Sequence, residues 1–148
     1  MPEREFTVRD PQFEARIRAS FARQALMGLL GAELAVVRPG EVEITLPFRD
    51  DLTQQHGFLH AAATTAIMDS ACGYAASTLA PGGTEVLSVE FKVNLLAPAA
   101  GDRFVAAGRV VRAGRTITVC SSEAHAEVGG ARKRVALMQA TIISQPSD

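Results

Sequence analysis

The chain has 148 residues, of which 47% are hydrophobic and 21% are charged, and its net charge is −1. This length fits one domain with a sizeable core, and near-neutrality argues against nucleic acid as the main partner, because phosphate binding needs a basic excess. No apolar run reaches the length of about 18 residues that a transmembrane helix needs. The charged N-terminus, MPEREFTVRD, lacks the apolar stretch of a secretory signal, so we expect a cytoplasmic protein without membrane partners.

The first 57 residues predict one helix, two strands and a loop. Apolar residues recur every four positions over residues 11–27, at Phe13, Ile17, Phe21 and Ala25, which indicates an amphipathic helix. Residues 32–37 and 41–46 are typical of two strands joined by a turn at residues 38–40. Residues 47–57 form a loop of charged and amide residues.

Residues 60–79 predict a buried helix, because small apolar residues occupy nearly every face of it. The helix ends at the breaker Ala80-Pro81-Gly82-Gly83. Asp69 is its only charged residue. A lone carboxylate in apolar surroundings is expensive to desolvate unless it is paired or needed, so Asp69 marks a candidate active site.

Four further strands are expected at residues 84–96, 103–112, 115–128 and 131–144. Their short connections imply antiparallel pairing. In the first of them, apolar and polar residues alternate, which places Leu87, Val89, Phe91, Val93 and Leu95 on one face and Ser88, Glu90, Lys92 and Asn94 on the other.

This order of elements predicts an α+β hotdog fold, in which a six-stranded antiparallel sheet wraps around one long buried helix. We expect one domain over residues 1–148, with the N-terminal helix at 11–27 and the core at about 30–144.

The segment around the helix start resembles the hotdog acyl-CoA thioesterases of the phenylacetate-pathway type. In that family an Asn or Gln is separated by five residues from a His-Gly-Gly sequence, and an Asp stands nine positions after the His. Gln54, His60 and Asp69 match this spacing, and residues 87–99 resemble the strand that follows the helix in the family. Here Ala61-Ala62 replaces the Gly-Gly pair. Alanine keeps the backbone N–H, so the added methyl group affects the size of the accepted acyl group more than the chemistry.

Hydrolysis of a thioester needs a base or nucleophile and a donor for the oxyanion. Asp69 fits the first role, either by activating water or by direct attack. Ala61 N–H, at the positive end of the helix dipole, is placed to stabilise the oxyanion, and Gln54 and His60 could hold the water or the carbonyl. The resemblance also implies that Ser88 lies near the catalytic acid, although the strand alternation puts it on the polar face.

Asp69 lies nine residues beyond His60, which is about 13 Å of helix rise and nearly half a turn of rotation. One helix cannot easily bring both to one reacting carbon, whereas antiparallel helices from two subunits could. We therefore expect a homodimer with composite sites. The family resemblance implies the same assembly, often as a dimer of dimers.

Gly57, Asn94, Arg112 and Arg115 are candidate contacts for the acyl-CoA substrate. His56 and His125 lie outside the family pattern and are expected to be structural. The histidines have no carboxylate at ligand spacing, so we expect neither a metal nor a cofactor. Cys72 and Cys120 form no metal-binding motif and are expected to be reduced core thiols.

Other interpretations remain open. Asp69 could be a structural acid bonded to neighbouring hydroxyls, His60 a residue that only satisfies the helix start, and Gln54 an ordinary loop amide. A hotdog hydratase or dehydratase would also use a buried acid and a histidine. A non-catalytic acyl-CoA-binding sensor would need a DNA-binding appendage, and residues 1–30 hold only one predicted helix.

Overall fold

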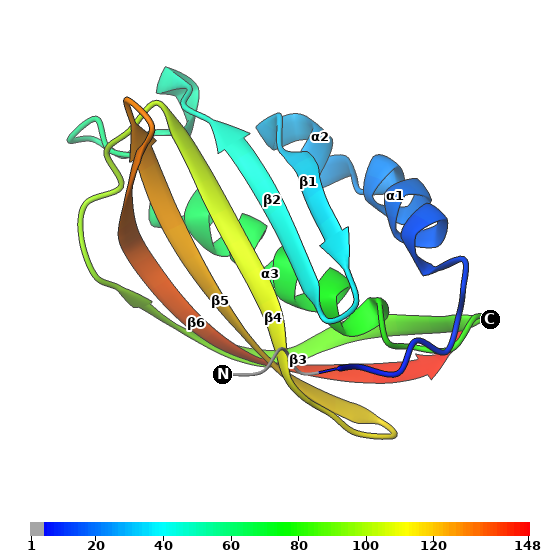
Figure 1. Cartoon of the computed structure of the whole chain (residues 1–148). Helices are drawn as coiled ribbons and strands as arrows, with labels where there is room; N and C mark the ends of the chain where they lie inside the picture. The colour runs from blue at the N-terminus through cyan, green and yellow to red at the C-terminus, as the bar shows by residue number, and fades with distance from the viewer. Residues whose placement is uncertain (1–4) are drawn as a thin grey trace.

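The computed structural model describes residues 5–148, and this part of the chain folds into one six-stranded antiparallel sheet with helices packed on it (Figure 1). The strand order is β1-β2-β4-β5-β6-β3, so β1 and β3 form the two edges. The strands are β1 (Glu33–Arg38), β2 (Glu41–Pro47), β3 (Thr84–Leu95), β4 (Arg103–Ala113), β5 (Ile117–Val128) and β6 (Ala131–Pro146).

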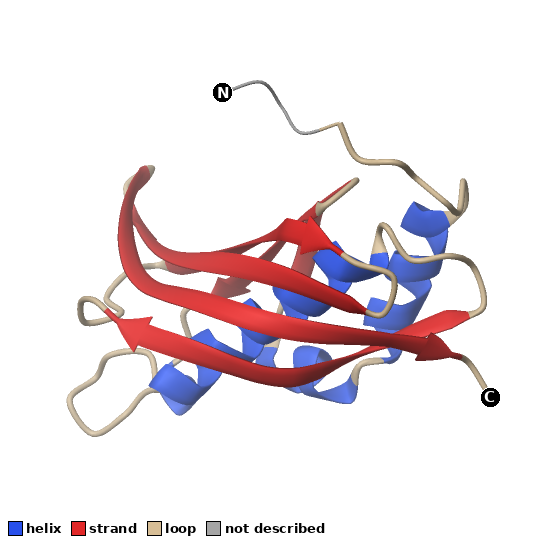
Figure 2. Ribbon diagram, turned by 90° about the horizontal axis from the view of Figure 1, so that it is seen from below, coloured by secondary structure: helices blue, strands red, loops and turns tan. Residues whose placement is uncertain are grey.

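The long helix α3 (Ala61–Ser77) lies in the concave face of the sheet, as Figures 1 and 2 show from two directions. It packs on all strands from β2 to β6, and most of its residues are buried. Its small side chains allow its backbone to approach the sheet closely. The closest approach is at Gly108 on β4, where an added Cβ would lie 2.4 Å from the carbonyl carbon of Ala71. Glycine at this position therefore sets the distance between α3 and the sheet.

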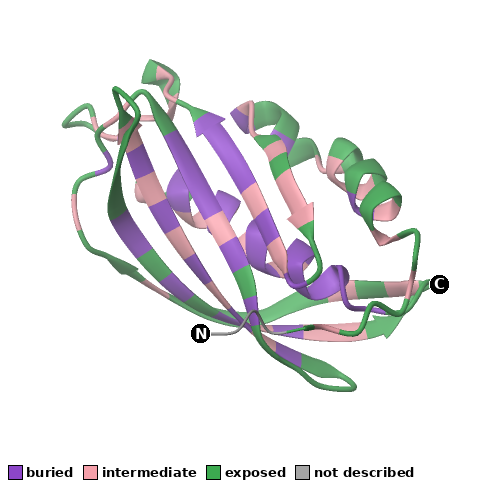
Figure 3. Ribbon diagram, viewed as in Figure 1, coloured by how far each residue is buried: buried purple, intermediate pink, exposed green. Residues whose placement is uncertain are grey.

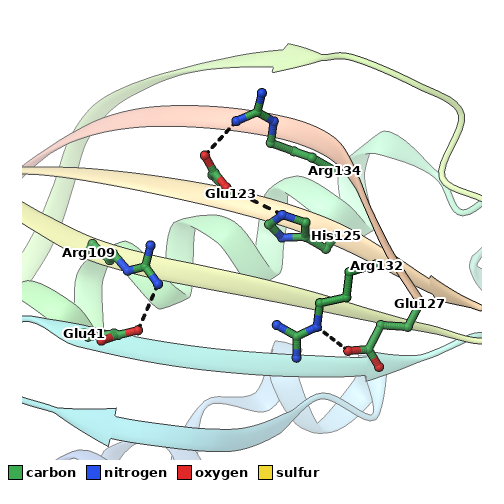
Figure 4. A network of polar contacts seen from close by, with 7 residues as sticks. All are labelled: Glu41, Arg109, Glu123, His125, Glu127, Arg132 and Arg134. Atoms are coloured by element: carbon green, nitrogen blue, oxygen red, sulfur yellow. Dashed lines mark hydrogen bonds and ion pairs between the residues drawn. The ribbon is translucent and has the colours of Figure 1, made fainter. Parts of the chain in front are cut away.

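The convex face of the sheet is polar. Along β5, buried residues facing α3 alternate with residues that point outward. Outward residues of β2, β4, β5 and β6 form ion pairs between strands (Figure 4), namely Glu41–Arg109 at 3.1 Å, Glu123–Arg134 at 2.9 Å and Glu127–Arg132 at 2.7 Å. Arg103 also bonds Glu127 and lowers the pKa of that carboxyl group. Exposed ion pairs contribute little stability, so the convex face is a solvated surface and the core lies on the side of α3.

The edge strand β3 contains a bulge that the alternation of its sequence conceals. The pairing register with β6 shifts between Ser88 and Glu90, which leaves Val89 as an extra residue. The bulge reverses the faces, so Ser88 lies on the helix side together with Phe91 and Val93, whose partners on β6 are buried. The expectation of one apolar face from Leu87 to Leu95 is therefore wrong.

The edge strand β3 also exposes large apolar residues, and Figure 3 colours most of this strand as exposed. The helix does not cover this edge in a single chain. The residues concerned are Leu87, Val89, Phe91, Leu95 and the following Leu96, each at least 41% exposed.

The N-terminal helix is also interrupted. The chain forms α1 (Phe13–Arg23) and α2 (Ala25–Leu30), and the expected single helix over residues 11–27 is wrong. The break falls at Gln24, whose ψ of 99° leaves the helical region. Gln24 ends α1, starts α2 and places its own side chain against α3.

The predicted fold class and the order of the other elements are confirmed: this is the hotdog arrangement of one long helix in a curved antiparallel sheet. In the described part of the chain, no helix is both long and apolar enough to cross a membrane.

Replacing Gly108 with Ala should push α3 away from β4 and lower the free energy of unfolding by about 1–3 kcal/mol, the usual cost of overpacking. The matched control is Gly28→Ala. Gly28 lies in α2, has no atom within 4 Å of an added Cβ, and should be unaffected or gain up to about 1 kcal/mol. Urea denaturation at one protein concentration measures both. Equal losses in the two variants would contradict the close approach.

Candidate active site

Asp69 lies midway along α3 and is half-buried, not enclosed as the sequence suggested. It sits on the side of the helix that the sheet leaves open. The Ser88 hydroxyl donates a hydrogen bond of 2.6 Å to Asp69 Oδ1. The bulge in β3 makes this contact possible, because strict alternation would have turned Ser88 away from the helix. The carboxylate is thus held at one oxygen.

A hollow of about 490 Å³ opens beside Asp69, between α1, α3 and the first residues of β3. Its wall contains the helix residues Asp69, Ser70, Gly73, Tyr74 and Ser77, which follow one face of α3. We call it the acid hollow, because Asp69 and Ser88 lie at its edge. A ligand bound there would be in contact with the carboxylate.

Polar contacts at three levels join the N-terminal segment to α3 along this hollow. Ser70 Oγ donates to Gln24 Oε1 at 2.8 Å. The hydroxyls of Ser20 and Tyr74 share a hydrogen bond of 3.1 Å. Arg16 Nη1 donates to Ser77 Oγ at 2.9 Å.

Sequence reasoning treated the N-terminal helix only by its apolar stripe and missed these groups. The signal was present, because Arg16, Ser20 and Gln24 recur every four residues and so share one helix face.

The start of α3 carries a second group of predicted site residues. His60 is the N-cap, and its Nδ1 accepts a hydrogen bond of 2.8 Å from Ala62 N–H. The structural interpretation of His60 is therefore realised in the structure. Among the described residues, the neighbouring Ala61 N–H has no hydrogen-bond acceptor. It is an unused donor at the positive end of the helix dipole.

Gln54 lies in the tight loop that precedes α3. Its main chain bonds Gly57 and Phe58, and its side-chain Oε1 accepts a hydrogen bond from His56 N–H. Gly57 closes this loop with a φ of +83°, a conformation that favours glycine. Among the described residues, the Gln54 carboxamide nitrogen donates no hydrogen bond, so its N–H groups are available to a ligand.

Gln54 and Ala61 line a second hollow of about 500 Å³, which we call the amide hollow. Apolar residues form most of its wall: Phe58, Leu59, Leu95, Leu96, Ala97, Pro98, Ala99 and Val135.

One chain therefore holds two separate half-sites. Asp69 and Ser88 belong to the acid hollow, whereas Gln54 and Ala61 belong to the amide hollow. Ala61 and Asp69 are eight residues apart on one helix, which is about 12 Å of rise. The structure brings together the members of each pair but not the two pairs.

The remaining candidates for substrate contact lie elsewhere. Asn94 pairs with Leu137 on the outer face of β3. Arg112 and Arg115 are exposed near the turn between β4 and β5, and Arg115 borders a smaller hollow with Leu79 and Ala80 at the far end of α3. None of these three lines the acid or the amide hollow.

The other histidines and the cysteines occupy structural positions. His56 is exposed in the loop, and His125 lies on the convex face at 3.6 Å from Glu123. Cys72 and Cys120 are free and buried in the core. Burial raises the pKa of the Cys120 thiol to about 12 and also raises the pKa of Cys72, so both remain protonated and unreactive at neutral pH.

Comparison with known proteins identifies a family. The model of the thioesterase superfamily matches residues 56–133. A crystal structure of a thioesterase family protein from Silicibacter pomeroyi is 46% identical, with a TM-score of 0.89, over 91% of this chain and 99% of that one. The PaaI protein of the Escherichia coli phenylacetic acid degradation operon is 19% identical, with a TM-score of 0.80, over 94% and 97% of the two chains, which shows a shared fold.

A curated relative from Saccharolobus solfataricus, whose name assigns it provisionally to the esterases, is 28% identical over 94 residues. The match covers 64% of this chain and 66% of that protein, slightly less than two thirds of its length.

Two variants of His60 distinguish its structural role as a helix cap from a chemical role in turnover. His60→Ala should lower the free energy of unfolding by about 1 kcal/mol, because Ala62 N–H loses its acceptor. His60→Asn offers a side-chain oxygen to the same amide and should restore most of that stability. Denaturation of both variants measures the cap, and turnover measured on the same samples shows whether the imidazole has a further role. Equal stability of His60→Ala and the wild type would contradict the capping bond.

Proposed function

Because the chain belongs to the thioesterase superfamily, we propose that it hydrolyses acyl-CoA thioesters to the free acid and CoA at sites shared between two subunits. The observation that carries the proposal is the pairing of a serine-bound carboxylate with a free helix N-terminal amide on the same helix. These groups match the two requirements of the reaction, a base or nucleophile and an oxyanion donor.

Asp69 supplies the first requirement. As a general base it would take a proton from water, whose oxygen then bonds the thioester carbon. As a nucleophile it would form an acyl-aspartyl anhydride that water opens in a second step. In both routes the C–S bond breaks and the CoA thiolate leaves and takes up a proton. Ser88 leaves one carboxylate oxygen of Asp69 free for this work.

Ala61 N–H supplies the second requirement. Its donor has no competing acceptor among the described residues, so the thioester oxygen can accept its hydrogen bond as negative charge develops there. Gln54 lines the same hollow and is proposed to hold the water or the carbonyl. His60 orders the turn through its cap, and a direct contact of its ring with substrate remains part of the proposal.

The two half-sites meet if two chains pair along β3. This edge is twelve residues long, and its backbone is free to pair with another strand. It also carries the exposed apolar residues that one chain leaves uncovered. A twofold axis at this edge would make the two α3 helices antiparallel, so the acid hollow of one chain would face the amide hollow of the other. We propose a homodimer, or a dimer of dimers built from it.

CoA binding is proposed for Gly57 beside the amide hollow, and for Asn94, Arg112 and Arg115 through their exposed polar groups. Arg115 borders the hollow at the far end of α3, and Arg112 lies near it at the end of β4, so only a partner chain or the long CoA arm would bring them into contact with the ligand.

Replacing Asp69 with Asn keeps the shape of the side chain but removes its basicity. Release of thiol from a panel of short, medium, long and aryl acyl-CoAs should fall by about 10²–10⁴-fold. Asp50→Asn is the control, because Asp50 is exposed and lies outside both hollows. Full activity of folded Asp69→Asn would overturn the assignment. Hydration of an enoyl-CoA without thiol release would instead favour a hydratase, and tight binding without turnover a binding module.

Shared sites can be tested by mixing two inactive variants. In a mixed dimer of Asp69→Asn and Gln54→Ala subunits, the Asp69 of one chain and the Gln54 of the other reconstitute one intact site and leave one doubly altered. Equal amounts that exchange freely should therefore recover about a quarter of wild-type activity, although each variant alone is nearly inactive. Failure of the mixture to recover activity, with exchange verified by differently tagged subunits, would place each site within one chain.

A further inference from the structure

The acid hollow has an unusual floor for an acyl pocket. Its length follows α3 from Asp69 to Ser77, which is about 12 Å of helix rise. Along that length the N-terminal segment presents Gln24, Ser20 and Arg16 in turn to the polar groups of α3. A group that leaves the reacting carbon in this direction meets hydrogen-bonding side chains rather than an apolar wall.

An unsubstituted alkyl chain would bind poorly on this floor. It would remove water from the hydroxyl and amide groups without replacing the hydrogen bonds that water makes. An acyl group with its own polar substituent would replace them.

Gln24 has donors available for such a ligand, and the Tyr74 hydroxyl, which shares one hydrogen bond with Ser20, can form another. The contact from Gln24 Nε2 to the Tyr74 hydroxyl is 3.5 Å, at the limit of a hydrogen bond, so the amide N–H groups are weakly used. The Tyr74 ring packs against Phe21 at 6.0 Å between centroids, which fixes where its hydroxyl points.

We propose, on the basis of the function proposed above, that Gln24 and Tyr74 are specificity-determining residues that bind a hydrogen-bonding substituent of the acyl group. The substrate class is then an acyl-CoA whose acyl chain carries a hydroxyl or similar polar group away from the thioester. The N-terminal segment is, in this proposal, part of the acyl site and not only a cover for the sheet edge.

The position of Tyr74 along α3 sets the distance between that substituent and the thioester. Tyr74 is five residues beyond Asp69, about 7–8 Å along the helix. A six-carbon acyl chain with a terminal hydroxyl spans a similar length. The amide hollow offers the opposite environment, because most of its wall is apolar. An acyl group that entered the amide hollow of the partner would therefore bind more tightly if it were apolar.

The experiment compares kcat/KM for hexanoyl-CoA and 6-hydroxyhexanoyl-CoA. The wild type should favour the hydroxylated substrate by about tenfold or more, the contribution of one or two neutral hydrogen bonds. Gln24→Leu and Tyr74→Phe should each bring this ratio close to one, mainly by loss of activity on the hydroxylated member. Tyr74→Phe keeps the ring on Phe21, and hydrolysis of hexanoyl-CoA by both variants verifies that they fold. The control is Gln12→Leu, because the Gln12 side chain caps no helix and lies outside the hollow, and it should keep the wild-type ratio.

A wild-type preference for hexanoyl-CoA, or a preference for the hydroxylated substrate that survives both variants, would overturn this inference and leave the proposed hydrolysis intact. No thiol release from either substrate or from the wider panel would overturn the proposed function itself, and the assignment of an acyl site would fall with it.

Discussion

The close packing of α3 on the sheet is the constraint on which the site depends. Gly108 lets the backbone at Ala71 approach β4 to a distance that no side chain would allow. Asp69 lies only two residues before Ala71, so the same contact fixes the height and rotation at which the carboxylate emerges from the helix. Buried alanines of α3 such as Ala71 and Ala75 permit this approach, whereas Asp69, Ser70 and Gly73 lie on the open side of the helix. A helix with larger side chains would pack farther from the sheet, and the Ser88 hydroxyl would be too far from Asp69 to form its hydrogen bond.

The same rigidity keeps the two halves of the chemistry apart. A straight helix cannot bend its first turn toward its middle, so Ala61 N–H and Asp69 stay about 12 Å apart along the axis whatever the loops do. The exposed apolar edge at β3 and the separation of the two half-sites would both be resolved by the proposed homodimer. Burial of that edge would supply association energy, and the antiparallel helices would supply the missing half of each site. In this view the dimer is a catalytic requirement as much as a means of covering apolar surface.

The sequence predicted most of the fold because its periodicities are strong. Turns mark the hairpins, and a run of small residues with one acid marks α3. Two local details were not accessible to pattern reasoning. The bulge at Val89 sits inside a run that alternates without fault, so only the pairing with β6 reveals that Ser88 faces the helix. Gln24 has no breaker character, and the hydrogen bond that its side chain accepts from Ser70 on α3 is a tertiary contact that local propensity does not report. The half-burial of Asp69 was missed for a related reason, since composition reports what surrounds a residue along the chain and not which side the sheet leaves open.

These corrections all concern the acid hollow. The bulge brings Ser88 to Asp69, and the break at Gln24 turns an amide toward Ser70 and Tyr74. Both of these departures from regular structure move a polar group toward the same cavity, although a continuous helix and a strictly alternating strand would have been simpler ways to cover the sheet. Irregular backbone is commonly retained where a site needs side chains that regular elements would direct elsewhere. If this hollow binds the acyl group, as proposed, it would discriminate by the hydrogen bonds that a substrate can replace, and chain length alone would be a weak criterion for binding in it.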